Sequence, residues 1–368
     1  MRRPIALLGA VLTGAGLAAS ATAKAQPSVS IVPLSFVVWE FRGPTSRVAA
    51  VAPSLAQLRS DASLRGKPAV IVWGEGGGSA LTLAGREVRA IQLGPAAGDL
   101  EASERGRDTI PASRVEVSGP ITASLTGPTR DYAHDALGTA VHARSVSIAE
   151  RRPVQMGATA QAVPTDVAAV EAGPGAVFED REPRLARLTR ENGHEIVTIK
   201  SYIDRGSALA VIGRRDGRWR VLAETAPTGE ARRWVNPAAV ADFLGTGRPQ
   251  IAVVRSPHAE GVLQLWDFDG DKLSLLAEKP GYANHAFGRA AQDLAAAADT
   301  DGDGRPELVL PTADLRAVAI LTMRGGIREL SRIELPARAA TGLAALGAGP
   351  DLHILVGLED GRVADIRP

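Results

Sequence analysis

An acidic nonapeptide in the last quarter of the chain has the residue types and the spacing of a calcium loop. It runs Asp-Thr-Asp-Gly-Asp-Gly-Arg-Pro-Glu over residues 299–307. Alternate residues of a tight loop point inward together, and four carboxylates so close repel one another unless a cation lies between them. Ca²⁺ accepts about six to eight oxygen ligands in a flexible arrangement. The oxygen ligands that we expect are the side chains of Asp299, Asp301, Asp303 and Glu307 and the main-chain carbonyl of Arg305.

Two other interpretations of this loop are open to a sequence argument. An EF-hand needs a glutamate at the twelfth position, between two helices, but the twelfth residue is Leu310, inside a β-type run. A solvated Asp-Gly turn without metal is the other alternative. The ligand types and their spacing favour calcium, and Gly304 permits the positive φ that reverses the chain.

The acidic nonapeptide is the last of three similar segments, which begin about 55 residues apart at 187, 242 and 299. An apolar run follows each of them, beginning at Ile196, Ile251 and Leu308. The earlier copies have lost most of the acidic residues but keep Asn192 and Gly247 at the turn position. We expect them to be metal-free turns of the same shape.

Each repeat predicts four short strands, the last two joined by a tight Gly-containing hairpin. A repeated four-stranded unit of roughly 50 residues is typical of a propeller blade. We therefore expect an all-β fold, a β-propeller of about six to seven four-stranded blades, over residues 26–368, with clear repeats over 186–368. An N-terminal strand would complete the last blade, and Phe36 to Trp39 is the candidate. Residues 54–64 and 289–298 are expected to be short helices at most.

The segment from Asp299 to Leu310 resembles the FG-GAP repeat, also called the VCBS-type repeat, of integrin-like β-propellers. The likeness continues in weaker form at 242–254 and 187–198. The resemblance implies a propeller fold, calcium in some loops and binding roles outside the cell.

A second group of residues is predicted to lie on the face opposite the acidic nonapeptide, as a polar and aromatic ligand patch. Hydrogen bonding between neighbouring blades is the competing interpretation. The residues are Trp234, Asn236, His258, Tyr282, Asn284 and His285.

The N-terminal segment and the composition indicate where the protein is located in or outside the cell and which partners it has. Arg2 and Arg3 precede an apolar run and small-x-small sites that end at Ala25, which predicts a signal peptide over residues 1–25. A formal net charge of +1 gives no field that favours nucleic acid. No later apolar stretch is long enough for a membrane span. The chain has no cysteine, so its core, its strands or metal must stabilise it.

The functional expectation is a calcium-binding module or scaffold in the periplasm or outside the cell, with a protein or glycan partner. The chain contains no nucleophile elbow, zinc-protease or phosphate-loop motif. Catalytic groups brought together only in space escape such a search. A propeller hydrolase or lyase with a site in the central funnel is therefore the alternative, and a structural subunit of an envelope complex is a third hypothesis.

Overall fold

The computed structural model shows an all-β chain. It describes residues 26–52, 66–94, 97–99, 106, 108–154, 162–189 and 193–368. Two short helical segments are α1 (Arg47–Val51), which is capped by the Ser46 hydroxyl, and η3 (Gly349–Asp351), which is one 3-10 turn. None of the described helices is long and apolar enough to cross a membrane.

Four sheets are antiparallel and four-stranded. The first contains β2 (Glu40–Arg42), β3 (Val70–Gly74), β4 (Gly77–Ala84) and β5 (Glu87–Gln92). The second contains β15 (Val235–Ala241), β16 (Gln250–Arg255), β17 (Val262–Phe268) and β18 (Leu273–Pro280). The third contains β19 (Ala296–Ala298), β20 (Glu307–Pro311), β21 (Ala317–Thr322) and β22 (Arg328–Glu334). The fourth contains β23 (Ala339–Leu346), β24 (His353–Leu358), β25 (Val363–Arg367) and β1 (Ser28–Ile31).

A nine-stranded sheet holds two further groups of four consecutive strands. One group is β6 (Glu116–Ser118), β7 (Ile121–Thr129), β8 (His142–Arg151) and β9 (Thr165–Glu171). The other is β11 (Arg184–Ala186), β12 (Glu195–Tyr202), β13 (Gly206–Arg215) and β14 (Arg218–Glu224). The short strand β10 (Ala176–Phe178) pairs with β8 and with β12 and so links the two groups.

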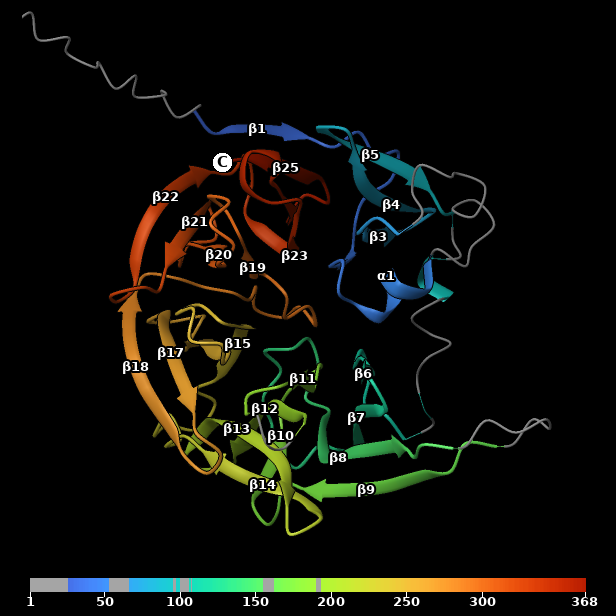
Figure 1. The fold of residues 1–368 in the computed structure, drawn as a ribbon, viewed down its shortest axis with the longest axis vertical. Coiled ribbons are helices and arrows are strands. Elements are labelled where there is room, and N and C mark those ends of the chain that lie inside the picture. The colour runs from blue at the N-terminus through green and yellow to red at the C-terminus, as the bar shows by residue number, and fades with distance from the viewer. Residues whose placement is uncertain are drawn as a thin grey trace, which may run out of the picture.

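The strand groups follow one another around a common centre (Figure 1). Their first strands lie toward the centre, and β2 contacts β23, β23 contacts β19, and β19 contacts β15. On the other side β15 contacts β12, and β11 contacts β6. This arrangement places the strand ends of distant segments close to one point.

The N-terminal strand joins the C-terminal sheet, but it is not the strand that the sequence indicated. β1 pairs antiparallel with β25, with Ser28 opposite Arg367 and Ile31 opposite Ala364. The prediction for Phe36 to Trp39 was wrong, because that segment lies outside any strand and crosses toward the first sheet. There Val38 N–H donates to Gly361 O (2.8 Å) and Trp39 N–H donates to Trp73 O (3.0 Å). The edge of β25 is already paired with β1, which precedes residues 36–39 in the chain. The segment from Phe36 to Trp39 is therefore left as a connection between two sheets, although it is the more apolar of the two.

The three repeated loops have equivalent places, since each joins the first strand of a group to the second. The last position of each loop accepts a hydrogen bond from a main-chain N–H of the same loop. These bonds run from Leu188 to Glu195 (2.9 Å), from Leu244 to Gln250 (3.1 Å) and from Thr300 to Glu307 (3.1 Å). The three loops thus share this hydrogen bond although the earlier two have lost most of the acidic residues. Asn192 lies outside the described residues.

The apolar residue after each loop packs between neighbouring groups. Ile196, Ile251 and Leu308 are fully buried, as the repeat pattern predicted. Leu308 on β20 belongs to one cluster with Ala252 and Leu263 of the preceding sheet. Contact between sheets therefore supplies much of the core.

We expect Leu308→Ala to lower the free energy of unfolding by about 2–5 kcal/mol, because it leaves a cavity between two sheets. Urea unfolding followed by tryptophan fluorescence measures this change. Leu330→Ala is the matched control: Leu330 is exposed on β22, and its loss should cost no more than about 0.5 kcal/mol. Equal losses in the two variants would contradict packing between the sheets.

The helix expected at 289–298 is not formed. The segment is irregular and ends in β19. Its alanine-rich pattern was overridden by tertiary contacts: Gln292 is buried in hydrogen bonds, and Leu343 N–H donates to Asp293 O (2.8 Å). The other helix expected, at 54–64, lies outside the described residues.

Candidate functional site

The acidic loop, residues 299–307 between β19 and β20, brings three of the predicted ligands together. One carboxylate oxygen each of Asp299, Asp301 and Glu307 lies within 4.8 Å of the other two. Asp299 also accepts hydrogen bonds from Gly302 N–H (2.7 Å) and Gly304 N–H (3.0 Å). Both glycines have positive φ, near 80°, which glycine adopts without steric cost. The grouped carboxylate oxygens are a donor set that suits calcium.

The remaining two predicted ligands have a different environment. Asp303 is ion-paired with Arg324, which comes from the β21–β22 hairpin. The hydrogen bond from Arg324 holds the pKa of Asp303 below its ordinary value. Arg324 also contacts Glu307, with 2.9 Å between Nη2 and Oε1. Arg305 donates its main-chain N–H to Asp303 Oδ1 (2.9 Å). An arginine that the sequence did not indicate thus supplies positive charge to this loop.

The predicted ligand patch divides into smaller, mostly buried contacts. Asn236 and Asn284 bond across two groups: Asn284 Nδ2 donates to Asn236 O (3.1 Å), and Asn236 Nδ2 donates to Asn284 O (3.2 Å). Tyr282 lies apart and donates to Glu329 (2.9 Å). These three side chains therefore form hydrogen bonds between separate segments of the chain.

Trp234, His258 and His285 form the other part of the patch. The two histidine rings are joined through His258 Nε2 and His285 Nδ1 (2.7 Å), and His285 Nε2 bonds to Arg289 O (2.8 Å). Burial lowers the pKa of His285 to about 3, so this ring is neutral at ordinary pH. Its Nε2 then carries the proton and donates it to Arg289 O, which leaves Nδ1 to accept from His258. Trp234 stacks on His258 at 6.0 Å between ring centroids.

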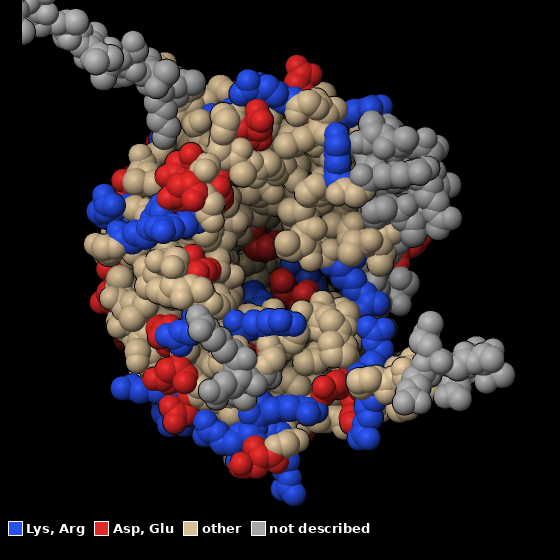
Figure 2. Space-filling model, in the orientation of Figure 1, with Lys and Arg blue, Asp and Glu red and all other residues tan. Residues whose placement is uncertain are grey.

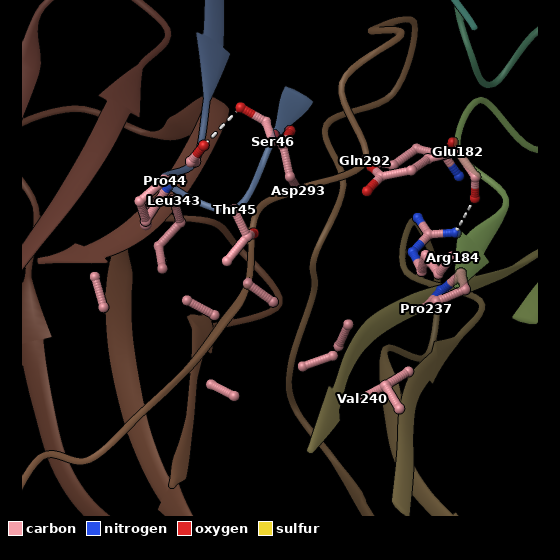
Figure 3. Close-up of a pocket in the computed structure, with 18 of the residues that line it drawn as sticks. Pro44, Thr45, Ser46, Glu182, Arg184, Pro237, Val240, Gln292, Asp293 and Leu343 are labelled. Atoms are coloured by element: carbon pink, nitrogen blue, oxygen red, sulfur yellow. Dashed lines mark hydrogen bonds between the residues drawn. The ribbon is translucent and has the colours of Figure 1, made fainter. Parts of the chain in front are cut away.

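The sequence suggested a central funnel only as the place of an alternative enzyme site, and it did not indicate which residues line the central cavity. Its volume is about 430 Å³, and Figure 2 shows the hollow with acidic and basic side chains inside it. In Figure 3, Thr45 and Leu343 lie on one side of the space, opposite Glu182 and Arg184. Every strand group contributes lining residues. The lining includes Thr45, Arg114, Glu116, Glu182, Arg184, Ala239, Val240, Asp293, Ala296 and Leu343.

Charged groups at one end of the cavity form a connected set. Arg114 Nη1 lies 2.8 Å from Glu182 Oε2 and 3.2 Å from Asp293 Oδ2. Burial raises the pKa of Glu182, but the positive charge of Arg114, together with that of Arg184, outweighs burial and the net shift is downward. Glu182 is therefore ionised at neutral pH, and its carboxylate is suited to accept a hydrogen bond from a ligand or to bind a cation.

Asp180 lies behind the lining of the cavity and holds Arg184 in place through an ion pair. Its side chain is fully buried and lies 3.1 Å from Arg184 Nη1. It also accepts hydrogen bonds from the main-chain N–H groups of Arg181 (2.8 Å) and Ile199 (3.2 Å). Next to it, Glu179 bonds His134 Nδ1 (2.5 Å) and the Ser201 hydroxyl (2.5 Å). The whole connection between β10 and β11 is thus held by buried polar contacts.

One signal in the sequence could have indicated part of this site. Residues 179–184 read Glu-Asp-Arg-Glu-Pro-Arg directly after the apolar β10, a charged run where a strand group begins. Arg114 and Asp293 have no comparable signal, because they lie far from this run and from each other in sequence.

No family model and no curated protein matches this chain. Among solved structures, a luciferin-regenerating enzyme is similar over 93% of this chain and 96% of that chain, with 11% identity and a TM-score of 0.40. The rhamnogalacturonan lyase of Bacillus licheniformis is similar over 77% of this chain and 55% of that chain, with 12% identity and a TM-score of 0.43. The likeness to FG-GAP repeats remains a prediction from the sequence.

Proposed function

We propose that this protein is an exported, calcium-binding β-propeller that acts as a binding module and takes its ligand in the central cavity. One observation carries the proposal: all strand groups line a single cavity whose charged end is positioned by ion pairs. A volume of about 430 Å³ is within the range of small-molecule sites. The ligand is accordingly a compact molecule, or the terminal unit of a glycan or protein partner.

The propeller has six blades in this proposal. Four are the four-stranded sheets, and the groups β6–β9 and β11–β14 of the nine-stranded sheet are the other two. The pairing of β1 with β25 supports closure of the ring, since it joins the two ends of the chain in one blade. Radial packing of this kind leaves the cavity at the axis.

A propeller hydrolase or lyase is the second candidate, and the carboxylates of Glu182 and Asp293 beside Arg114 favour it. General acid catalysis at neutral pH needs a carboxyl group with a raised pKa. The pKa of Glu182 is lowered instead, so this carboxylate is not suited to the role of general acid. Turnover of a glycoside, an ester or a uronate by the wild-type protein, abolished in Glu182→Gln, would favour the enzyme.

Binding in the cavity is tested by filling it. The mature protein is incubated with a small-molecule extract of the cells that produce it, and retained compounds are identified by native mass spectrometry. We expect the wild type to retain a compound that Ala239→Phe does not, because Ala239 lines the cavity and the larger ring occupies it. If the wild-type protein and Ala239→Phe retain the same compounds, or if neither retains any, this function is contradicted.

Calcium should stabilise the fold through the acidic loop. A ligand that binds only the folded state adds about 2.7 kcal/mol at a hundredfold excess over its Kd. We expect a chelator to lower the melting temperature of the wild type and to leave that of Asp301→Ala unchanged. Arg324→Gln, which removes the competing guanidinium beside Asp303 and Glu307, should bind calcium more tightly than the wild type. A melting curve of the wild type that ignores the chelator would contradict the site.

Export is proposed from the N-terminal segment. The mature chain should begin at Lys24 or Gln26 in the periplasm or the medium. Recovery of the chain from the cytoplasm with residues 1–25 intact contradicts export.

A further inference from the structure

Two imidazole rings meet between two connections of the sheet that contains β15 to β18. His258 lies in the connection from β16 to β17, and His285 follows β18. His258 Nε2 and His285 Nδ1 are 2.7 Å apart, with 4.9 Å between the ring centroids. His258 is exposed, whereas His285 is buried. The pair is therefore reached from solvent along the His258 ring.

The other nitrogen of His285 is already engaged. Its Nε2 donates to Arg289 O (2.8 Å), so Nδ1 holds the lone pair that points toward His258. Histidines that bind metal ions almost always donate their other ring N–H in this way to a carbonyl or a carboxylate, which fixes the tautomer. Burial lowers the pKa of both rings below the ordinary histidine value. Both rings are thus neutral, which is the form of imidazole that binds metal.

Aromatic and main-chain contacts hold the two rings in place. Trp234 stacks on His258 at 6.0 Å and is nearly perpendicular to His285 at 4.9 Å between centroids. Phe287 packs against His258 at 5.1 Å. The main chain near His258 is bonded to that of Trp234, since Ser256 N–H donates to Trp234 O (2.7 Å). Rings that are already held in place lose little conformational entropy when they bind a ligand.

The distance between the two nitrogens is close to that between two ligands of one ion. Nitrogens that bind zinc at about 2.1 Å, at a right angle or a tetrahedral angle, lie about 3.0–3.4 Å apart. The rings need to separate by less than about 1 Å to reach this spacing, and the exposed ring of His258 has room to tilt outward. Among the described residues, only the acidic loop groups three or more such side chains, so water fills the remaining positions around the ion.

We infer that His258 and His285 bind a divalent transition-metal ion, with His258 Nε2 and His285 Nδ1 as its protein ligands. The ion takes the place of the proton between these nitrogens. His258 then carries its ring proton on Nδ1, so no proton is lost from the pair. Imidazole nitrogen suits zinc, copper and nickel, whereas calcium takes oxygen ligands. The site is separate from the acidic loop and from the lining of the central cavity, and it goes beyond the proposed function.

Isothermal titration of the mature wild-type protein with zinc tests this site. Calcium is present in excess throughout, so that it competes with zinc for the acidic loop. We expect His258→Gln to weaken zinc binding at least about tenfold, because one of two protein ligands is lost. His258 is exposed, and circular dichroism establishes that this variant is folded. The matched control, His194→Gln, removes an imidazole that bonds to the Ser118 hydroxyl (2.8 Å) and should leave zinc binding unchanged.

The ring nitrogen resonances provide a measurement that needs no variant. Zinc should shift the ¹⁵N resonances of His258 Nε2 and His285 Nδ1 and leave those of His194 unchanged, whereas a purely structural hydrogen bond predicts no response to zinc. The inference is wrong if the wild type binds no zinc, if His258→Gln binds it as tightly as the wild type, or if His194→Gln weakens it equally. None of these results bears on the binding function, which the chelator and Ala239→Phe test separately.

Discussion

Replacing Asp180 with alanine should lower the free energy of unfolding by about 3–5 kcal/mol, because removal of one partner of a buried ion pair leaves the other charge uncompensated. Asp180 is fully buried and forms an ion pair with Arg184, at 3.1 Å. The change also strands two main-chain donors, Arg181 N–H and Ile199 N–H. Urea unfolding at neutral pH measures the loss, which should be accompanied by weaker ligand binding because Arg184 loses its support.

Two comparisons make this result specific. Asp180→Asn keeps the shape and one acceptor oxygen, so its loss should lie between that of the wild type and that of the alanine variant. Asp166→Ala breaks an exposed pair with Arg152 and should lower the free energy of unfolding far less than Asp180→Ala does, because solvent screens the exposed pair. Similar costs for Asp180→Ala and Asp166→Ala would show that the buried network does not stabilise the strand group.

Removal of β1 should destabilise the C-terminal sheet that contains β25. The strand pairs with β25 along its whole length, from Ser28 opposite Arg367 to Ile31 opposite Ala364. Loss of about four main-chain hydrogen bonds, at about 1 kcal/mol each, predicts a loss of roughly 3–5 kcal/mol for a mature chain that begins at Val32. The unpaired edge of β25 should also promote association of chains.

Hydrogen exchange provides the local measurement. Amides of Val363–Arg367 should exchange faster in the shortened chain, more than 300 residues from the deletion, whereas those of Gln250–Arg255 should change least. A double substitution of Val29 and Ile31 by threonine keeps the strand, because both side chains are exposed, and it serves as the control. Unchanged exchange in β25 after the deletion would argue against closure through β1.

Repetition made much of the fold predictable. The apolar runs at Ile196, Ile251 and Leu308 identified buried strands, since a strand packed between sheets needs apolar side chains whatever its neighbours are. The grouping of the carboxylates of Asp299, Asp301 and Glu307 was predictable for a similar reason, because these residues are close in sequence. Which N-terminal segment completes the last sheet was not, since β1 and Phe36–Trp39 both have strand-forming residues and only the path of the chain distinguishes them.

What the sequence alone determined is what neighbouring residues decide among themselves: short strands, tight turns, the repeat, and the spacing of carboxylates in residues 299–307. Tertiary structure decided the rest. Arg324 reaches the acidic loop from a hairpin about 20 residues away. At the central cavity Arg114 forms ion pairs with Glu182 and Asp293, which it meets only because the strand groups converge on one centre. An ion pair depends on distance in space, and distance in space follows from how the sheets pack, which no local pattern encodes.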